Sequence, residues 1–263
     1  MVKAAKYPRN IRVFIIGESP LVEEYAELCA VRGFEVAVQW NQPQKAKARL
    51  LSKTIRRSSV IAPSTLYGVE LTNTHIDQKK KNLQKLDRAL APKKVILSSS
   101  VTVTATEQAS WIRHGERLIG ISGLPSFLAE NLIEFSPAVQ TDQTKLSEAQ
   151  DFFIRLGKEV SVVQDRVGMV LPRIVCSIIN EAYFALQEDI ASPEDIDLAM
   201  KLGTNYPYGP IEWGEKIGIG HVYTILAALQ NDTHDDRYRI APLLKQLATA
   251  GEWWKKTRNP VVS

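Results

Sequence analysis

The chain has 263 residues, a formal net charge of +4 and two cysteines. This length holds one large or two modest domains, each able to bury a core. The charge is small and the basic residues are scattered, which does not indicate a nucleic-acid surface, and the lysine run at residues 79–81 is interpreted as a solvated helix face. No apolar run reaches membrane-spanning length and no signal peptide is recognisable, so we expect a cytoplasmic protein without membrane association.

Apolar runs and turn residues alternate from the beginning of the chain. Residues 11–16 are apolar except for Arg12, which is typical of a buried parallel strand. A helix over residues 21–31 and a strand over residues 36–38 follow. This order of strand, turn, helix and strand is the first half of a dinucleotide-binding fold.

Strand and helix patterns continue to alternate up to residue 163 and then become purely helical. The expected strands cover residues 95–97, 118–121 and 160–163, and the expected helices cover residues 79–90 and 146–156. We therefore predict an α/β domain with a Rossmann-like doubly wound sheet over residues 1–164, followed by an all-α domain over residues 165–263.

The helical half carries the most specific strings. Residues 191–197 read ASPEDID, with a Ser suited to cap a helix and a Pro in its first turn, and residues 206–210 read YPYGP. These strings resemble the C-terminal domain of 3-hydroxyacyl-CoA dehydrogenases, and a weaker resemblance covers the N-terminal half. The resemblance implies NAD-dependent oxidation of an acyl-CoA in fatty acid metabolism, and a homodimer formed through the helical domain. Around residues 42–67 the chain looks shorter than the family.

The nucleotide motif of the family is only partly present. A dinucleotide fold uses Gly-x-Gly-x-x-Gly after its first strand, but residues 17–22 read GESPLV and keep Gly17 alone. Ser19 before Pro20 is predicted to cap the helix instead, and the acid expected at the end of the second strand is missing. We therefore expect weakened NAD binding. By resemblance, the cofactor contacts would be Gly17, Ser19, Asn41, Thr72 and Lys79.

The resemblance also locates the family's catalytic acid–base pair. Residues 117–121 are similar to the family strand that ends in His-Phe-Phe-Asn-Pro, which places Ser122 at the position of the catalytic His. Glu134 falls where the family has the carboxylate that orients this His. An unactivated Ser hydroxyl does not act as a base near neutral pH.

Two further catalytic positions of the family are also changed. The catalytic Ser aligns with Val101, or with Ser100 or Thr102 after a shift of one residue. The family's Asn aligns with Pro172, which has no side-chain hydrogen-bond donor.

No other residue clearly replaces the missing base. His75 follows a predicted strand at the edge where doubly wound sheets bind ligands, although a surface His is the simpler interpretation. Cys29 and Cys176 fall on apolar helix faces and are expected to be buried free thiols. No group of His, Cys and carboxylates has metal-ligand spacing, so no metal is expected.

Three functions remain open. The first is a family protein with impaired or lost hydride transfer that persists as an acyl-CoA-binding or partner-binding dimer. The second is an active NAD-dependent 3-hydroxyacyl-CoA (3-hydroxybutyryl-CoA) dehydrogenase with an atypical site that uses His75 or water. The third is a different reaction of an acyl-CoA around Ser122 and Glu134. The absence of a base favours the first.

Overall fold

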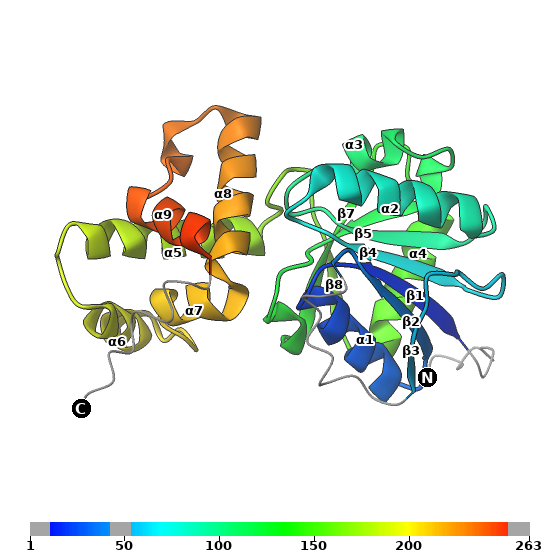
Figure 1. The fold of residues 1–263 in the computed structure, drawn as a ribbon, viewed down its shortest axis with the longest axis horizontal. Coiled ribbons are helices and arrows are strands. Elements are labelled where there is room, and N and C mark those ends of the chain that lie inside the picture. Colours follow the sequence, from blue (N-terminus) through cyan, green and yellow to red (C-terminus); the bar gives the residue numbers. More distant parts are fainter. Residues whose placement is uncertain (1–10, 43–53, 252–263) are drawn as a thin grey trace.

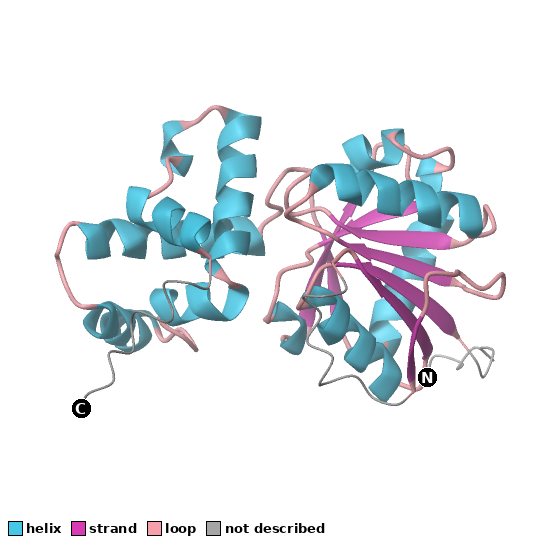
Figure 2. Ribbon diagram, viewed as in Figure 1, coloured by secondary structure: helices cyan, strands magenta, loops and turns pink. Residues whose placement is uncertain are grey.

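The computed structural model describes residues 11–42 and 54–251. A twisted sheet with helices on both faces forms the N-terminal part, and a group of helices alone forms the C-terminal part (Figure 1). Figure 2 shows that every strand formed by the described residues lies in the first of these two parts. The predicted fold class, a doubly wound α/β domain followed by an all-α domain, is confirmed.

The sheet contains eight strands. Their bounds are β1 Arg12–Gly17, β2 Glu35–Trp40, β3 Ile55–Arg57, β4 Tyr67–Leu71, β5 Val95–Ser99, β6 Leu118–Ile121, β7 Leu132–Pro137 and β8 Glu159–Val162. The spatial order is β3-β2-β1-β4-β5-β6-β7-β8. All neighbours are parallel except β6 and β7, which are antiparallel. Most side chains of the central strands are apolar and buried because helices cover both faces of the sheet, and the buried polar exceptions are Glu70 of β4 and Ser98 and Ser99 of β5.

Two pairs of helices cover the sheet. Their bounds are α1 Leu21–Val31, α2 Ile76–Ala89, α3 Ala105–Ser110 and α4 Gln143–Arg155. Buried side chains of α1 and α4 form one core with the sheet, and those of α2 and α3 form a second core. The two cores hold different strand residues, as expected when alternate side chains of a strand point to opposite faces. The sheet is therefore the middle of three layers.

The helical part forms its own core. Its helices are α5 Leu171–Gln187, α6 Pro193–Thr204, α7 Pro210–Ile217, α8 Ile219–Thr233 and α9 Pro242–Ala250. The predicted cap of α6 is confirmed, because the Ser192 side chain accepts the Asp195 backbone N–H at 3.1 Å. Val101, Leu124 and Phe127 from the α/β part join this core. An apolar contact therefore connects the two parts of the molecule.

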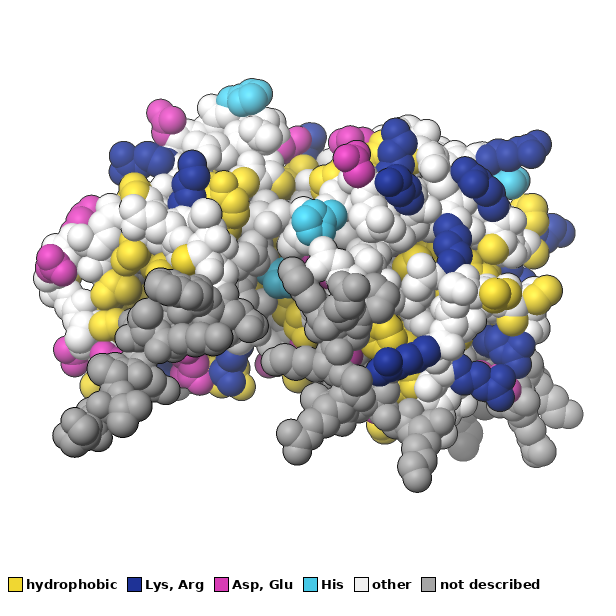
Figure 3. All heavy atoms as spheres, viewed as in Figure 1, with side chains coloured by type: hydrophobic (Ala, Val, Ile, Leu, Met, Phe, Trp, Pro, Cys, Tyr) yellow, Lys and Arg dark blue, Asp and Glu magenta, His cyan; other side chains and the backbone are white. Residues whose placement is uncertain are grey.

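Three further features are the state of the cysteines, the length of the described helices and the distribution of basic side chains on the surface. Cys29 and Cys176 are both buried and unpaired, as predicted. Within residues 11–42 and 54–251, no helix combines the length and apolarity needed to cross a membrane. On the face shown in Figure 3, Lys and Arg side chains are spread over both parts of the molecule.

Candidate functional site

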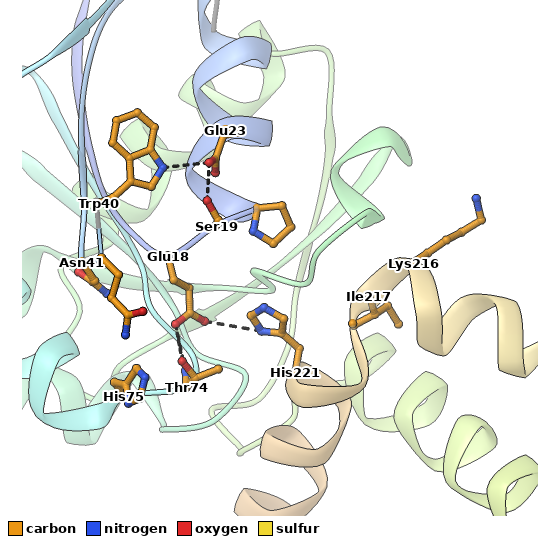
Figure 4. Close-up of a pocket in the computed structure, with 13 residues that line it drawn as sticks. Glu18, Ser19, Glu23, Trp40, Asn41, Thr74, His75, Lys216, Ile217 and His221 are labelled. Atoms are coloured by element: carbon orange, nitrogen blue, oxygen red, sulfur yellow. Dashed lines mark hydrogen bonds and ion pairs between the residues drawn. The ribbon is translucent and has the colours of Figure 1, made fainter. Parts of the chain in front are cut away.

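A cavity of about 470 Å³ lies between the sheet and the helical part. The turn after β1 and the ends of β2 and β4 supply one wall, and α7 and the start of α8 supply the other (Figure 4). Parallel sheets bind ligands at this carboxyl edge of their strands. The volume lies within the range of about 300–1,000 Å³ that is usual for small-molecule sites. Its charged and aromatic wall residues include Glu18, Glu23, Trp40, His75, Lys216 and His221.

Gly17 ends β1 directly before Glu18 and Ser19, the first residues that line this cavity. A methyl group on its Cα would lie 2.5 Å from the Leu71 carbonyl oxygen, so no larger residue fits between β1 and β4. The following carboxylate, that of Glu18, accepts the Asn73 backbone N–H at 2.9 Å and the Thr74 hydroxyl at 2.6 Å. Glu18 thus fixes a negative charge at the turn and connects β1 to the segment after β4.

Glu23 stands at the end of β2, although it belongs to α1. Its Oε1 atom accepts Trp40 Nε1–H at 3.0 Å and the hydroxyl of Ser19. Its Oε2 atom is buried and has no hydrogen-bond partner among the described residues. The prediction that Ser19 caps α1 is wrong: the N-cap is Pro20, without a side-chain hydrogen bond, because the Ser19 hydroxyl donates to Glu23.

His221 reaches the same cavity from α8. Its Nδ1 atom lies 3.6 Å from Glu18 Oε1, which is an ion-pair distance but too long for a hydrogen bond. This nitrogen is buried and has no hydrogen-bond partner in the described part of the chain. Burial lowers the pKa of His221, while the Glu18 charge and a hydrogen bond to the Ser19 backbone oppose this effect. Burial therefore favours the uncharged form of this imidazole.

Of the five residues predicted to contact the cofactor, only two line this cavity. Ser19 and Asn41 line the cavity, but Gly17, Thr72 and Lys79 are not among its lining residues. Lys79 is fully buried, and its Nζ atom donates to the Thr72 carbonyl oxygen at 2.8 Å.

Lys79 also forms a buried ion pair with Glu70, with 2.5 Å between Nζ and Oε2. Both side chains have no exposed surface. The interpretation of residues 79–81 as a solvated face is wrong for Lys79, because the first lysine of the run turns toward the sheet. Its charge stabilises the end of β4, and it is closed to a ligand.

Ser122 and Glu134, which the sequence resemblance predicts to lie at catalytic positions, are bound to the backbone. The Ser122 hydroxyl accepts the Glu134 backbone N–H at 3.0 Å. The Glu134 carboxylate accepts the N–H groups of Val170 at 3.0 Å and Leu171 at 2.8 Å. Those amides belong to the start of α5, where a helix has unsatisfied donors and favours negative charge. Glu134 therefore caps a helix in this chain.

The space beside Ser122 is nearly filled. Its free volume is about 10 Å³, and Leu124, Phe127 and Pro172 are among the residues that surround it. A volume of this size holds about one water molecule. The ring of Phe127 stacks on Trp213 of α7, with 5.8 Å between ring centroids. Contacts between the two parts of the molecule thus occupy the surroundings of Ser122.

The remaining predicted catalytic positions do not line this space. Ser100 is fully buried, and its hydroxyl accepts Gln108 Nε2–H at 2.9 Å. The Thr102 hydroxyl donates to the Asn73 carbonyl oxygen at 3.3 Å, and Val101 packs into the helical core. His75 is exposed and lines the larger cavity. Within the described ranges, no group of three or more His, Cys, Asp and Glu side chains is arranged to hold a metal ion.

Comparisons with known proteins agree with this architecture. The model of the NAD binding domain of 3-hydroxyacyl-CoA dehydrogenase matches residues 61–166, and that of the C-terminal domain matches residues 168–263. A 3-hydroxybutyryl-CoA dehydrogenase of Bradyrhizobium diazoefficiens is 30% identical, over 94% of this chain and 93% of its own length.

Solved structures give the same result. The crystal structure of (S)-3-hydroxybutyryl-CoA dehydrogenase from Ralstonia eutropha has a TM-score of 0.74 and 26% identity, covering 91% of this chain and 93% of that one. M. tuberculosis FadB2 reaches a TM-score of 0.79 at 19% identity, with coverage of 91% and 93%, and shows the fold alone. This chain belongs to the 3-hydroxyacyl-CoA dehydrogenase family.

Proposed function

We propose that NAD-dependent hydride transfer is impaired or lost in this chain, and that it acts as an acyl-CoA-binding or partner-binding dimer. The observation that carries this proposal is the filled space at Ser122, which has a free volume of about 10 Å³. A substrate at that position needs a base within hydrogen-bond reach. Ser122 offers a hydroxyl without an imidazole beside it, and Glu134 is occupied by backbone amides.

The turn after β1 supports weak NAD binding. A helix start binds a pyrophosphate through free amides and its positive end. Here the Glu18 carboxylate lies at that turn and Glu23 lies one helical turn further on, so a pyrophosphate would meet negative charge. The match to the NAD binding domain model begins at residue 61, which leaves the Gly17 turn outside the match. These residues do not fit a pyrophosphate.

Exposed apolar side chains support a dimer formed through residues 165–263. Leu198 and Leu202 on α6 are 54% and 79% exposed, and no residue of α6 is buried. A helix with an apolar stripe is normally stabilised by burying that stripe against another element. A second copy of the chain is our proposed partner for α6.

The unpaired state of both cysteines supports a cytoplasmic location.

An active dehydrogenase with an atypical site is the second candidate. One observation favours it: the larger cavity contains a His–Glu pair, His221 and Glu18, and the family also uses a His and a Glu. His75 adds a second imidazole to the same wall.

An enzymatic assay separates the two candidates. We expect the purified full chain to bind acetoacetyl-CoA in a calorimetric titration but to oxidise no NADH with it above the buffer rate. Turnover that His221→Ala or His75→Ala abolishes would overturn the proposal in favour of the second candidate. If acetoacetyl-CoA does not bind and NADH is not oxidised, the partner-binding form of the proposal remains, and the acyl-CoA form is rejected.

A further inference from the structure

We propose that residues 124–130, which we call the plug segment, form a movable plug that closes the space beside Ser122, and that Glu24 and Lys158 hold it closed. This inference deepens the proposed function and rests on it in taking the Ser122 space as the position that a substrate would occupy. In the plug segment, Phe127 is the residue that fills the space. Glu24 and Lys158 are positioning residues that act through it.

The side chain of Phe127 crosses from one part of the molecule to the other. Phe127 begins η3 Phe127–Ala129, a short turn between β6 and β7 of the α/β part. Its ring nevertheless belongs to the core of the helical part, is 9% exposed and stacks on Trp213 of α7. The same side chain lines the space beside Ser122, where the free volume is about 10 Å³. One residue therefore both fills this space and joins the two parts.

The backbone directly before Phe127 is strained. Ser126 has a φ of 68°, in the left-handed region. A residue with a Cβ atom rarely adopts this conformation, which costs free energy and persists only where neighbouring contacts enforce it. Strained positions of this kind are common in segments that switch between states. The contacts that hold Ser126 therefore decide whether the plug segment stays in place.

Glu24 of α1 holds the start of the plug segment. Both of its carboxylate oxygens accept the Ser126 backbone N–H, at 3.0 and 3.1 Å. Removing this carboxylate would leave the N–H group without its acceptor, which disfavours the closed position. Glu24 thus fixes the strained residue from the α/β side.

Lys158 holds the other end of the plug segment. This lysine lies between α4 and β8 and is 8% exposed. Its Nζ atom donates to the carbonyl oxygens of Leu128 at 2.5 Å and Glu130 at 2.7 Å. Hydrogen bonds from a charged donor are stronger than those between neutral groups. Glu24 and Lys158 therefore hold the two ends of a turn whose middle residue reaches the helical part.

Few backbone hydrogen bonds stabilise the plug segment itself. Within it, the Phe127 N–H donates to the Leu124 carbonyl oxygen at 3.3 Å, and the Glu130 N–H donates to that of Phe127 at 3.1 Å. Local opening requires the least free energy where few such bonds hold a segment. The plug segment should therefore open while the α/β part and the helical part both remain folded.

Thiol labelling of the full chain tests this. Ser122→Cys places a thiol at a half-buried position in the wall of the space, and mass spectrometry of the peptides follows its alkylation by iodoacetamide. Cys29 and Cys176 are fully buried, one in each part of the molecule, so they report global unfolding in the same sample. We expect Phe127→Ala to raise the labelling rate at position 122 at least about tenfold, while both natural cysteines stay protected.

Variants of the two positioning residues separate their roles from that of general packing. Glu24→Ala should also raise the rate at position 122 about tenfold, because the Ser126 N–H loses its acceptor. Glu24→Gln keeps an acceptor oxygen and should leave the rate nearly unchanged. Lys158→Met keeps most of the aliphatic stem but loses the donor, and should act in the same direction as Glu24→Ala.

A second aromatic residue provides the matched control for Phe127. The Tyr206 ring lies 5.6 Å from that of Trp213 but does not line the Ser122 space, so Tyr206→Ala should not raise the rate. If Phe127→Ala exposes the natural cysteines, Phe127→Leu replaces it, because leucine keeps an apolar side chain and loses the stacked ring. The comparison of Glu24→Ala with Glu24→Gln decides even where both Phe127 variants fail to fold.

Three results would overturn the proposal: an unchanged rate at position 122 after loss of the Phe127 ring, equal rates for Glu24→Ala and Glu24→Gln, or a rise in Tyr206→Ala as large as that in Phe127→Ala. None of these measurements uses NADH or an acyl-CoA. Turnover in a chain with a closed plug would reject the proposed function alone, and an inactive chain in which Phe127 shields nothing would reject the plug alone.

Discussion

The Glu134 carboxylate accepts the backbone N–H of Leu171 at 2.8 Å and so joins β7 to the first turn of α5. Its other oxygen accepts the Val170 N–H at 3.0 Å. This side chain is only 4% exposed, so solvent competes little with either bond. Glu134, which the sequence resemblance predicts to be a catalytic position, thus supports the junction between the α/β part and the helical part.

We therefore expect Glu134→Ala to lower the free energy of unfolding by about 2 kcal/mol, because two buried N–H groups and a helix start lose their acceptor. Glu134→Gln keeps one acceptor and should lose less. Urea denaturation measures both changes, with Glu159→Ala as an exposed control. Equal stability of all three variants would show that the capping bonds contribute nothing.

The second prediction tests whether the buried ion pair of Lys79 and Glu70 stabilises the fold. Lys79→Met would leave the Glu70 carboxylate buried without its charge partner, and we expect a loss of about 3–5 kcal/mol in the free energy of unfolding. Adding Glu70→Leu should recover much of this loss, because both charges are then removed. Lys81→Met, an exposed neighbour on the same helix, should be nearly neutral. If Lys79→Met retained full stability, the buried pair would not support the fold.

The pH dependence of stability should contain a contribution from Glu24. Burial raises the pKa of Glu24 from 4.5 to about 7, against the lowering effect of a hydrogen bond from the Ser126 backbone. The folded protein then binds a proton that the unfolded chain has released, so stability falls as pH rises from about 4.5 to about 7. The effect is at most about 3 kcal/mol.

Glu24→Gln removes this titration. We expect its free energy of unfolding to exceed that of the unmodified chain at pH 8, with little difference between them at pH 4.5. Denaturation curves at several pH values check the slope, and Glu116→Gln is the exposed control. A slope that Glu24→Gln leaves unchanged would assign the pH dependence to another group.

Local sequence signals predict the elements that have clear boundaries. The helix predicted over residues 21–31 matches α1 Leu21–Val31, because Pro20 and Gly33 mark its two ends. The strand β7 was not predicted, because Glu134 and Ser136 interrupt its apolar pattern. Both polar side chains are buried by partners far along the chain: Ser136 donates to Asp165 Oδ1 at 2.7 Å, and Glu134 binds the start of α5.

Contacts between residues far apart in the chain also limit what the sequence predicts about the cavity. The Gly17 turn is recognisable because a motif describes it, but the contacts of Glu23 with Trp40 and of Glu18 with His221 are not local. They arise only when β2 packs beside α1 and α8 approaches the sheet. Part of the expected shortened segment around residues 42–67 lies outside the described residues; within the described part, the unpredicted strand β3 extends the sheet.

The exposed face of α6 gives the last prediction. If a second copy covers Leu198 and Leu202, a charge at Leu202 would be buried without a partner in the dimer, and Leu202→Glu should shift the protein toward a monomer. Light scattering during gel filtration measures this shift in mass at micromolar protein. Val139→Glu, at a residue of the α/β part that is 90% exposed, should leave the mass unchanged. A monomeric unmodified chain, or a Leu202→Glu variant that remains fully dimeric, would show that α6 does not form the dimer interface. Because α6 contributes no buried residue within the chain, its substitution tests association with little effect on the fold itself.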